Sequence, residues 1–238
     1  MVRISGLRSE RFQFLVFLGL SVMEILFTGI LTFSHQLSGF QRFFGTINPI
    51  APMVFVSLLG VVLFSYLISR GWFDIYKKEN LRGFVYSSVL PTLFVIPAIV
   101  LDLVIVLPEN LNVLFPESLL FYPAMAYFVE IIFHILPLSL LSILVTSFGK
   151  KTSSSRIGWI CLAVVALLEP VFQLILGFSS PLPLWAVVYS NGIHVFLINM
   201  TQLFIFKRYD FVSMYSFRLV YYVLWHITWG YLRLGLLF

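Results

Sequence analysis

The sequence predicts an all-α polytopic membrane protein, a helical bundle of about seven transmembrane helices with a cytoplasmic N-terminus. Three observations support this prediction: the composition, the length of the apolar runs and the distribution of basic residues. Apolar residues make up 60% of the 238 residues and charged residues only 11%, whereas soluble domains carry roughly 25% charged residues. A soluble core of this size has no use for so much apolar surface, so we expect lipid to cover much of it.

The apolar runs have the length of membrane-crossing helices. A helix rises about 1.5 Å per residue, so about 20 apolar residues cross ~30 Å of hydrocarbon. The runs are solid apolar blocks, and the alternating pattern of a membrane β-barrel is not found. We predict spans at 12–33, 48–69, 83–107, 118–147, 157–178, 182–206 and 214–237. The run at 118–147 exceeds one straight crossing, so we expect it to tilt or to bend near Pro137.

The basic residues predict the orientation, because cytoplasmic loops carry an excess of Lys and Arg. With the N-terminus inside and the C-terminus outside, thirteen of the fifteen fall in cytoplasmic segments: Arg3, Arg8, Arg11, Arg70, Lys77, Lys78, Arg82, Lys150, Lys151, Arg156, Lys207, Arg208 and Arg218. The outer segments hold only Arg42 and Arg233. The net charge of +5 therefore fits an anionic inner leaflet. We expect membrane lipid as a partner, and no nucleic acid.

The chain is expected to form a single transmembrane domain, 1–238, in the cell membrane. No repeat of fixed period, low-complexity tract or long linker divides it. Cys161 is the one cysteine and falls inside a predicted span. The sequence therefore predicts neither a disulfide framework nor a cysteine-based metal site.

Five ionisable side chains are expected near mid-membrane, because about 1.5 Å of rise per residue places most of them roughly 16–18 Å from a span end. They are Glu130, His134, Glu169, His194 and His226. Each of them, taken alone, can be explained as a hydrogen-bonding residue between two helices, and such a hydrogen bond contributes about 0.6 kcal/mol. A charged residue at the membrane centre costs about 2.5–3.5 kcal/mol, and such residues usually mark a site. Their joint occurrence favours a functional site, and Glu130 and His134 share one helical face.

Two other acidic residues are interpreted differently. Glu24 lies in the middle of the first span without a basic or His neighbour in the sequence, and we expect it to serve helix packing. Asp102 lies close to the outer end of its span and is expected to reach water. Neither is assigned to the candidate site.

A Glu with two or three His residues in a partly dry cavity suits amide hydrolysis. The Glu can take a proton from water while His residues and an amide donor such as Asn191 stabilise the oxyanion. The same residue types can hold Zn²⁺ with an open position for water. The Glu-x-x-x-His spacing at 130–134 differs from the His-Glu-x-x-His of soluble zinc proteases, so spacing leaves both versions open.

Three short motifs follow one another on the late helices: Val129-Glu130-Ile131-Ile132-Phe133-His134, Asn191-Gly192-Ile193-His194 and His226-Ile227-Thr228-Trp229-Gly230. Through them the region 116–238 resembles the core of the CPBP family, intramembrane proteases named for CAAX processing and bacteriocin processing, with an eight-helix-type bundle. Family members carry Glu-Glu-x-x-x-Arg, then Phe-x-x-x-His, then His-x-x-x-Asn or Asp.

The resemblance implies a divergent intramembrane endopeptidase. Glu130 would activate water, His194 and His226 would bind or polarise the scissile carbonyl, and His134 would support Glu130. The implied substrate is a membrane-embedded or juxtamembrane peptide, and the implied reaction requires no cofactor. The sequence does not define the substrate, nor whether it is prenylated.

The chain departs from the family pattern at four positions. Val129 replaces the first Glu, His134 the Arg, Ser190 the Phe and Gly230 the terminal Asn. The first Glu is usually the water-activating base in the family, so two alternatives stay open. Either Glu130 has taken over that role, or the chain is an inactive relative that acts as a scaffold or as a subunit of a larger membrane complex.

A third alternative is a proton-coupled transporter that uses Glu24, Glu130 and Glu169 as proton carriers. Transporters often show inverted repeats and paired broken helices. Neither pattern is found here, so this alternative is the least favoured.

Overall fold

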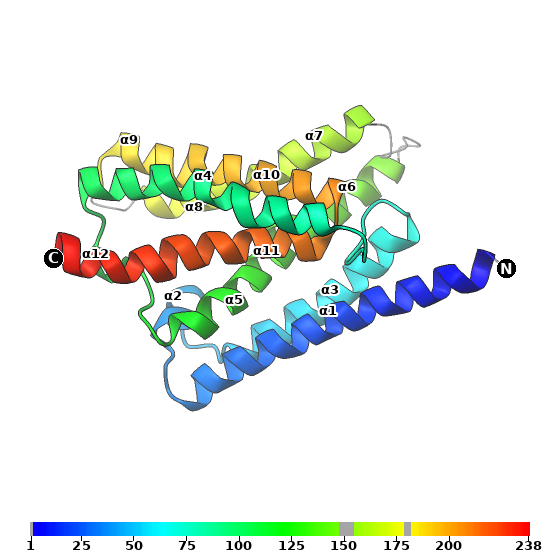
Figure 1. Cartoon of the computed structure of the whole chain (residues 1–238), viewed down its shortest axis with the longest axis horizontal. Helices are drawn as coiled ribbons and strands as arrows, with labels where there is room; N and C mark the ends of the chain where they lie inside the picture. Colours follow the sequence, from blue (N-terminus) through cyan, green and yellow to red (C-terminus); the bar gives the residue numbers. More distant parts are fainter. Residues whose placement is uncertain (1, 148–154, 179–181) are drawn as a thin grey trace.

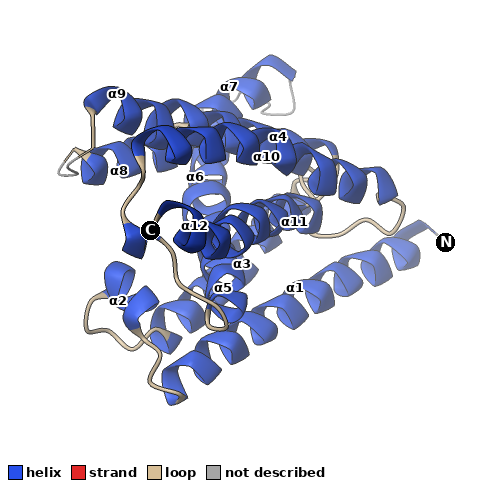
Figure 2. Ribbon diagram, turned by 60° about the vertical axis from the view of Figure 1, so that its left-hand side comes forward, coloured by secondary structure: helices blue, strands red, loops and turns tan. Residues whose placement is uncertain are grey.

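The computed structural model describes residues 2–147, 155–178 and 182–238, and these ranges contain helices and no β-strand (Figure 1; Figure 2). The all-α prediction is confirmed. Five helical stretches in these ranges are long and apolar enough to cross a membrane: Glu10–Phe33, Ile50–Ser69, Leu81–Ile105, Ser118–Ser147 and Ile157–Gly177. They coincide with the first five predicted spans, which supports a membrane protein.

The last two predicted spans also fall on continuous helical stretches, at 184–208 and 211–237. At about 1.5 Å per residue both are long enough for a crossing. They carry more polar side chains, among them Gln202 and Arg218, and do not belong to the five apolar stretches. The count of about seven spans therefore stays a prediction.

The helices form two layers with a central helix between them (Figure 1). One layer contains α1 (Val2–Phe33) and α3 (Ile50–Ser69), which pack side by side and are joined through the short α2 (Ser38–Phe44). The other layer contains α4 (Leu81–Ile105), α7 (Ser155–Ala166), α8 (Leu168–Gly177), α9 (Leu184–Val187) and α10 (Val195–Arg208). Between them, α11 (Phe211–Tyr222) packs against α4, α10 and α5 (Ser118–Val129), and α12 (Gly230–Leu237) continues its line.

Three helices contain a π-helical turn. These are η2 (Glu130–Ile135) between α5 and α6 (Leu136–Ser147), η3 (Val188–His194) between α9 and α10, and η4 (Val223–Trp229) between α11 and α12. Pro137 lacks an N–H, so the carbonyl four residues before it loses its usual donor, which favours an irregular turn at η2. A π turn thus lies directly before Pro137, and the expected tilt or bend of this helix stays a prediction.

Polar contacts hold both ends of the 211–237 helix. At its start, the Asp210 carboxylate accepts hydrogen bonds from the backbone N–H of Ser213 at 2.7 Å and of Lys77 at 2.9 Å, and from Asn80 Nδ2 at 3.1 Å. At its far end, Arg233 forms an ion pair with Asp102, with Nε 2.7 Å from Oδ2. These contacts fix the position of the helix along its own axis, and with it the position of Arg218.

The expectation that Asp102 reaches water is wrong. Its side chain is completely buried, paired with Arg233, and accepts a further hydrogen bond from Trp229 Nε1 at 2.7 Å. The buried charge is tolerated because the arginine and the indole satisfy both carboxylate oxygens.

Two arginines were also misplaced by the sequence pattern. Arg218 and Arg233 are buried inside the bundle, so neither belongs to a loop on either side. Without them the partition of thirteen to two becomes twelve to one, since 13 − 1 = 12 and 2 − 1 = 1. Lys150 and Lys151, which are part of the twelve, lie outside the described residues.

Candidate functional site

Arg218 joins two carboxylates at the centre of the bundle. Its Nε lies 2.5 Å from Glu130 Oε1, and its Nη1 and Nη2 donate to the two oxygens of Glu169 at 3.2 and 3.0 Å. Glu130 is 0% exposed, Arg218 3% and Glu169 4%. The three residues come from η2, α11 and α8, so this ion-pair group connects three helices that are distant in the sequence.

Amide side chains complete this group. Gln202 donates through Nε2 to Glu130 Oε1 and accepts from Arg218 Nη2 at 3.0 Å. Asn199 accepts from the same Nη2 at 3.3 Å, and Gln173 donates to Glu169 Oε1 at 3.0 Å. We refer to these six residues, Glu130, Glu169, Gln173, Asn199, Gln202 and Arg218, as the central network.

Glu130 and His134 lie together, as their shared helical face predicts. His134 Nδ1 is 2.5 Å from Glu130 Oε2, and both side chains are completely buried. The second ring nitrogen of His134, Nε2, has no hydrogen-bond partner among the described residues. Glu130 therefore has Arg218 and Gln202 on one oxygen and His134 on the other.

The other two predicted residues occupy separate surroundings. His194 Nε2 lies 3.3 Å from the hydroxyl of Tyr221, and the ring packs near Phe94. His226 Nδ1 lies 2.7 Å from Asn112 Oδ1, and its ring stacks on Tyr122 with a centroid distance of 4.6 Å. Within the described ranges, neither imidazole forms a hydrogen bond or an ion pair with Glu130.

One row of side chains connects the central network with His226. Arg218, Tyr222 and His226 follow one another at intervals of four residues on the 211–237 helix. Arg218 Nη1 lies 3.4 Å from the Tyr222 hydroxyl, and the rings of Tyr222 and His226 are 4.9 Å apart in an edge-to-face arrangement. Eight residues of helix separate Arg218 from His226 by about 12 Å along the axis.

At two positions where the chain differs from the CPBP motifs, a polar group from elsewhere in the chain lies nearby. His134 stands where the motif has an arginine, and the guanidinium of Arg218 contacts Glu130. Gly230 stands where the motif ends in Asn or Asp, and Asn112 lies next to it: a Cβ at Gly230 would lie 2.8 Å from Asn112 Nδ2. The same Asn112 contacts His226. The sequence does not reveal the Arg218–Glu130 and Asn112–His226 contacts, because 88 and 114 residues separate the partners.

Glu24 is completely buried, and Tyr215 of α11 donates a hydrogen bond of 2.5 Å to its Oε1. Its Oε2 has no hydrogen-bond partner. The contact joins α1 to α11, which agrees with the packing role expected for Glu24.

The residues around Glu130 do not fit a zinc site. In the part of the chain that the structure describes, no three His, Cys, Asp or Glu side chains are grouped closely enough to hold a metal ion. A catalytic zinc commonly has three protein ligands. Here Glu130 and His134 would offer two, and the guanidinium of Arg218 at 2.5 Å opposes a second cation.

The fold and the central network together define an all-helical protein with apolar helices of membrane-spanning length and a buried Glu–Arg–Glu group. Comparisons with protein-family models, with curated proteins and with solved structures found no match. The CPBP resemblance stays a prediction from three short motifs, and the function is inferred from the geometry.

Proposed function

We propose that this chain is a multi-pass cell-membrane protein that acts by binding, as a non-catalytic CPBP-like scaffold or subunit of a larger membrane complex. The proposal rests on the observation that both carboxylate oxygens of Glu130 already have hydrogen-bond partners within the protein. A general base needs to reach the proton of a water or substrate within about 2.6–3.2 Å. Both oxygens of Glu130 are held by Arg218, Gln202 and His134, and the side chain is 0% exposed. This arrangement favours a role in holding helices together.

The proposed topology is about seven crossings with a cytoplasmic N-terminus. Two observations support it. The polar residues of the two C-terminal helical stretches, such as Gln202 and Arg218, bond to each other and to Glu130, so lipid does not have to solvate them. The two chain ends also lie at opposite ends of the molecule (Figure 1), as an odd number of crossings requires.

A divergent intramembrane protease is the second candidate, and the π turns favour it. Each of the three π turns carries one predicted group: Glu130 with His134 in η2, His194 in η3 and His226 in η4. Such turns occur frequently at functional sites. In this candidate Glu130 takes a proton from water, and His194 and His226 bind the scissile carbonyl of a membrane peptide.

Proteolysis separates the two candidates. The purified protein in detergent is incubated with a library of membrane-embedded and juxtamembrane peptides, as wild type, as Glu130→Gln and as Glu79→Gln, a control at an exposed acid outside the bundle core. We expect no cleavage by any of them, and a lower free energy of unfolding for Glu130→Gln alone. Native gel electrophoresis of membranes that contain the wild-type chain should show a complex larger than the 27.4 kDa chain.

The protease candidate predicts the opposite pattern. Wild type and Glu79→Gln would cleave, and Glu130→Gln would fold yet be about 10²–10⁴-fold slower, as loss of a general base requires. That result would replace the binding proposal.

A further inference from the structure

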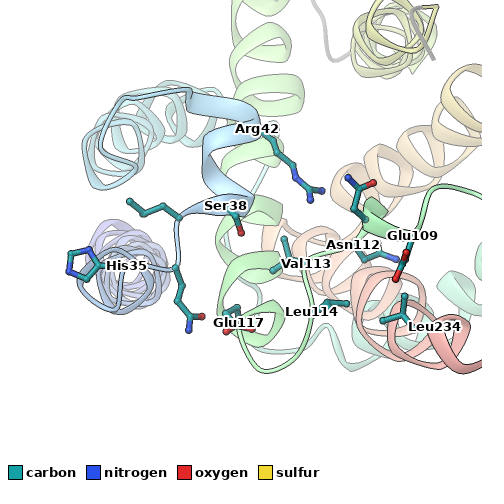
Figure 3. Close-up of a pocket in the computed structure, with 12 residues that line it drawn as sticks. His35, Ser38, Arg42, Glu109, Asn112, Val113, Leu114, Glu117 and Leu234 are labelled. Atoms are coloured by element: carbon teal, nitrogen blue, oxygen red, sulfur yellow. The ribbon is translucent and has the colours of Figure 1, made fainter. Parts of the chain in front are cut away.

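A cavity of about 450 Å³ lies at the end of the bundle where α1 ends and α5 begins (Figure 3). Its walls come from the turn after α1, from α2, from the 109–117 segment and from Leu234 of α12. The volume falls within the roughly 300–1,000 Å³ of small-molecule sites. The charged residues Arg42, Glu109 and Glu117 line it together with apolar Leu37, Val113 and Leu114.

The three charged side chains share the cavity without pairing. Arg42 extends from α2 toward the 109–114 segment (Figure 3), and Nη1 donates to the carbonyl of Leu111 at 3.2 Å. In the described ranges, neither Glu109 nor Glu117 forms a side-chain ion pair or hydrogen bond, and Arg42 has no carboxylate within 4.0 Å. The cavity thus keeps one guanidinium and two carboxylates apart and available.

This charge arrangement matches a ligand that carries both signs. A guanidinium binds a carboxylate or a phosphate through two parallel hydrogen bonds. A carboxylate accepts hydrogen bonds from a primary ammonium, which has three donors. The apolar residues Leu37, Val113 and Leu114 can cover the short carbon chain between the two groups.

We propose that this cavity binds a zwitterion in which a primary ammonium and an acidic oxyanion are a few bonds apart, with Arg42 at the oxyanion and one wall carboxylate, Glu109 or Glu117, at the ammonium, since these two carboxylates lie on opposite sides of the cavity (Figure 3). An ethanolamine phosphate head group of a lipid and a free amino acid share this chemistry. The proposal deepens the binding function proposed above and rests on it.

The cavity also contacts the candidate site. Asn112 is one of its lining residues, is 5% exposed, and holds His226 Nδ1 at 2.7 Å. A ligand in the cavity therefore lies one side chain away from His226. Asn112 therefore links the proposed ligand site to the 211–237 helix, which also carries Arg218.

The test measures ligand binding to the purified full chain by calorimetry. The soluble probes are phosphoethanolamine, glycine and glycerol 3-phosphate, and nanodiscs of phosphatidylcholine with or without phosphatidylethanolamine test the lipid source. We expect at least one of the ligands with a primary ammonium (phosphoethanolamine, phosphatidylethanolamine or glycine) to bind more tightly than glycerol 3-phosphate, which has no ammonium. Saturation with a soluble probe indicates a free solute, and preference restricted to the nanodiscs indicates a lipid head group.

Charge variants identify the groups. Arg42→Gln should weaken binding of every acidic probe by about tenfold or more, as loss of a charge-assisted pair implies. The Glu109→Gln/Glu117→Gln double variant should remove the preference for phosphoethanolamine over glycerol 3-phosphate while binding glycerol 3-phosphate at least as tightly as wild type, because two repelling carboxylates are lost. Glu79→Gln is the matched control and should bind as wild type.

Two results would overturn the site: no binding of any zwitterion to folded wild type, or binding that Arg42→Gln and the double variant leave unaffected. The hydrolysis experiment tests the role of Glu130, and the calorimetry tests the role of Arg42. Failure of the proposed function is therefore distinguishable from failure of the proposed ligand site.

Discussion

The central network and the cavity near α2 each contain one arginine and two glutamates, which are paired and buried in the network but unpaired in the cavity. In the centre, Arg218 is bonded to both Glu130 and Glu169, and all three side chains are buried. In the cavity, Arg42 shares the walls with Glu109 and Glu117 and pairs with neither. The contrast teaches that an arginine with two glutamates does not by itself define a function.

The difference follows from what surrounds the charges. A buried charge without a partner is costly, so the central carboxylates and guanidinium need each other to remain in the bundle. Near α2 the side chains reach water, which solvates each charge separately. A paired and buried group fixes helix positions, whereas an unpaired and accessible group is available to a ligand.

Replacing each arginine by Gln should show the largest difference. Arg218→Gln leaves Glu130 and Glu169 without their cation, and breaking a buried ion pair costs about 3–5 kcal/mol. Arg42→Gln removes an exposed charge with one hydrogen bond, and we expect a change within about 0.5 kcal/mol. Chemical unfolding of both variants in detergent measures the free energies of unfolding. Equal losses of the free energy of unfolding in the two variants would mean that the charges near α2 stabilise the fold as much as those of the central network.

An intermediate effect is expected where the two regions meet. Gly230→Ala places a methyl group 2.8 Å from Asn112 Nδ2, the residue that joins the cavity to His226. Overpacking of this kind costs about 1–3 kcal/mol. Gly19→Ala is the control, because a Cβ there meets nothing within 4 Å, and Gly→Ala inside a helix stabilises by about 0.5–1 kcal/mol.

Thermal unfolding of the two glycine variants checks this prediction. Opposite signs, with Gly230→Ala destabilised and Gly19→Ala slightly stabilised, would support close contact of Asn112 with the 211–237 helix. If Gly230→Ala is as stable as Gly19→Ala, Asn112 does not occupy the space next to Gly230.

The sequence could predict what depends on local pattern. Solid apolar runs predicted seven spans, five of which coincide with helices of spanning length, and the i, i+4 spacing placed His134 beside Glu130. Contacts across the bundle could not be predicted in this way, because Arg218 meets Glu130 over 88 residues of chain and Asn112 meets His226 over 114. Packing of the 211–237 helix against distant parts of the chain decides both contacts.

Arg218 did leave a signal in the sequence. It falls inside the predicted span 214–237, where an arginine needs a buried acidic partner, and Glu130 and Glu169 were already expected near mid-membrane. Counting it as a cytoplasmic residue followed the rule for loops, which does not hold for a residue inside a helix. Asp102 and Arg233 are a second case, since two residues expected near the outer surface form a completely buried pair.

The smallest effect is expected for the acidic residues near α2. Glu109→Gln and Glu117→Gln each remove a carboxylate without an ion pair, so the free energy of unfolding should change by no more than about 0.5 kcal/mol. Glu169→Gln is the contrasting variant in the centre, since it removes one of the two carboxylates bonded to Arg218, and its cost should approach the about 3–5 kcal/mol of a broken buried pair. Parallel denaturant titrations of the three variants compare them directly. A loss at Glu117 as large as that at Glu169 would show that the carboxylates near α2 serve the fold, and the cavity would then lose its ammonium-binding groups.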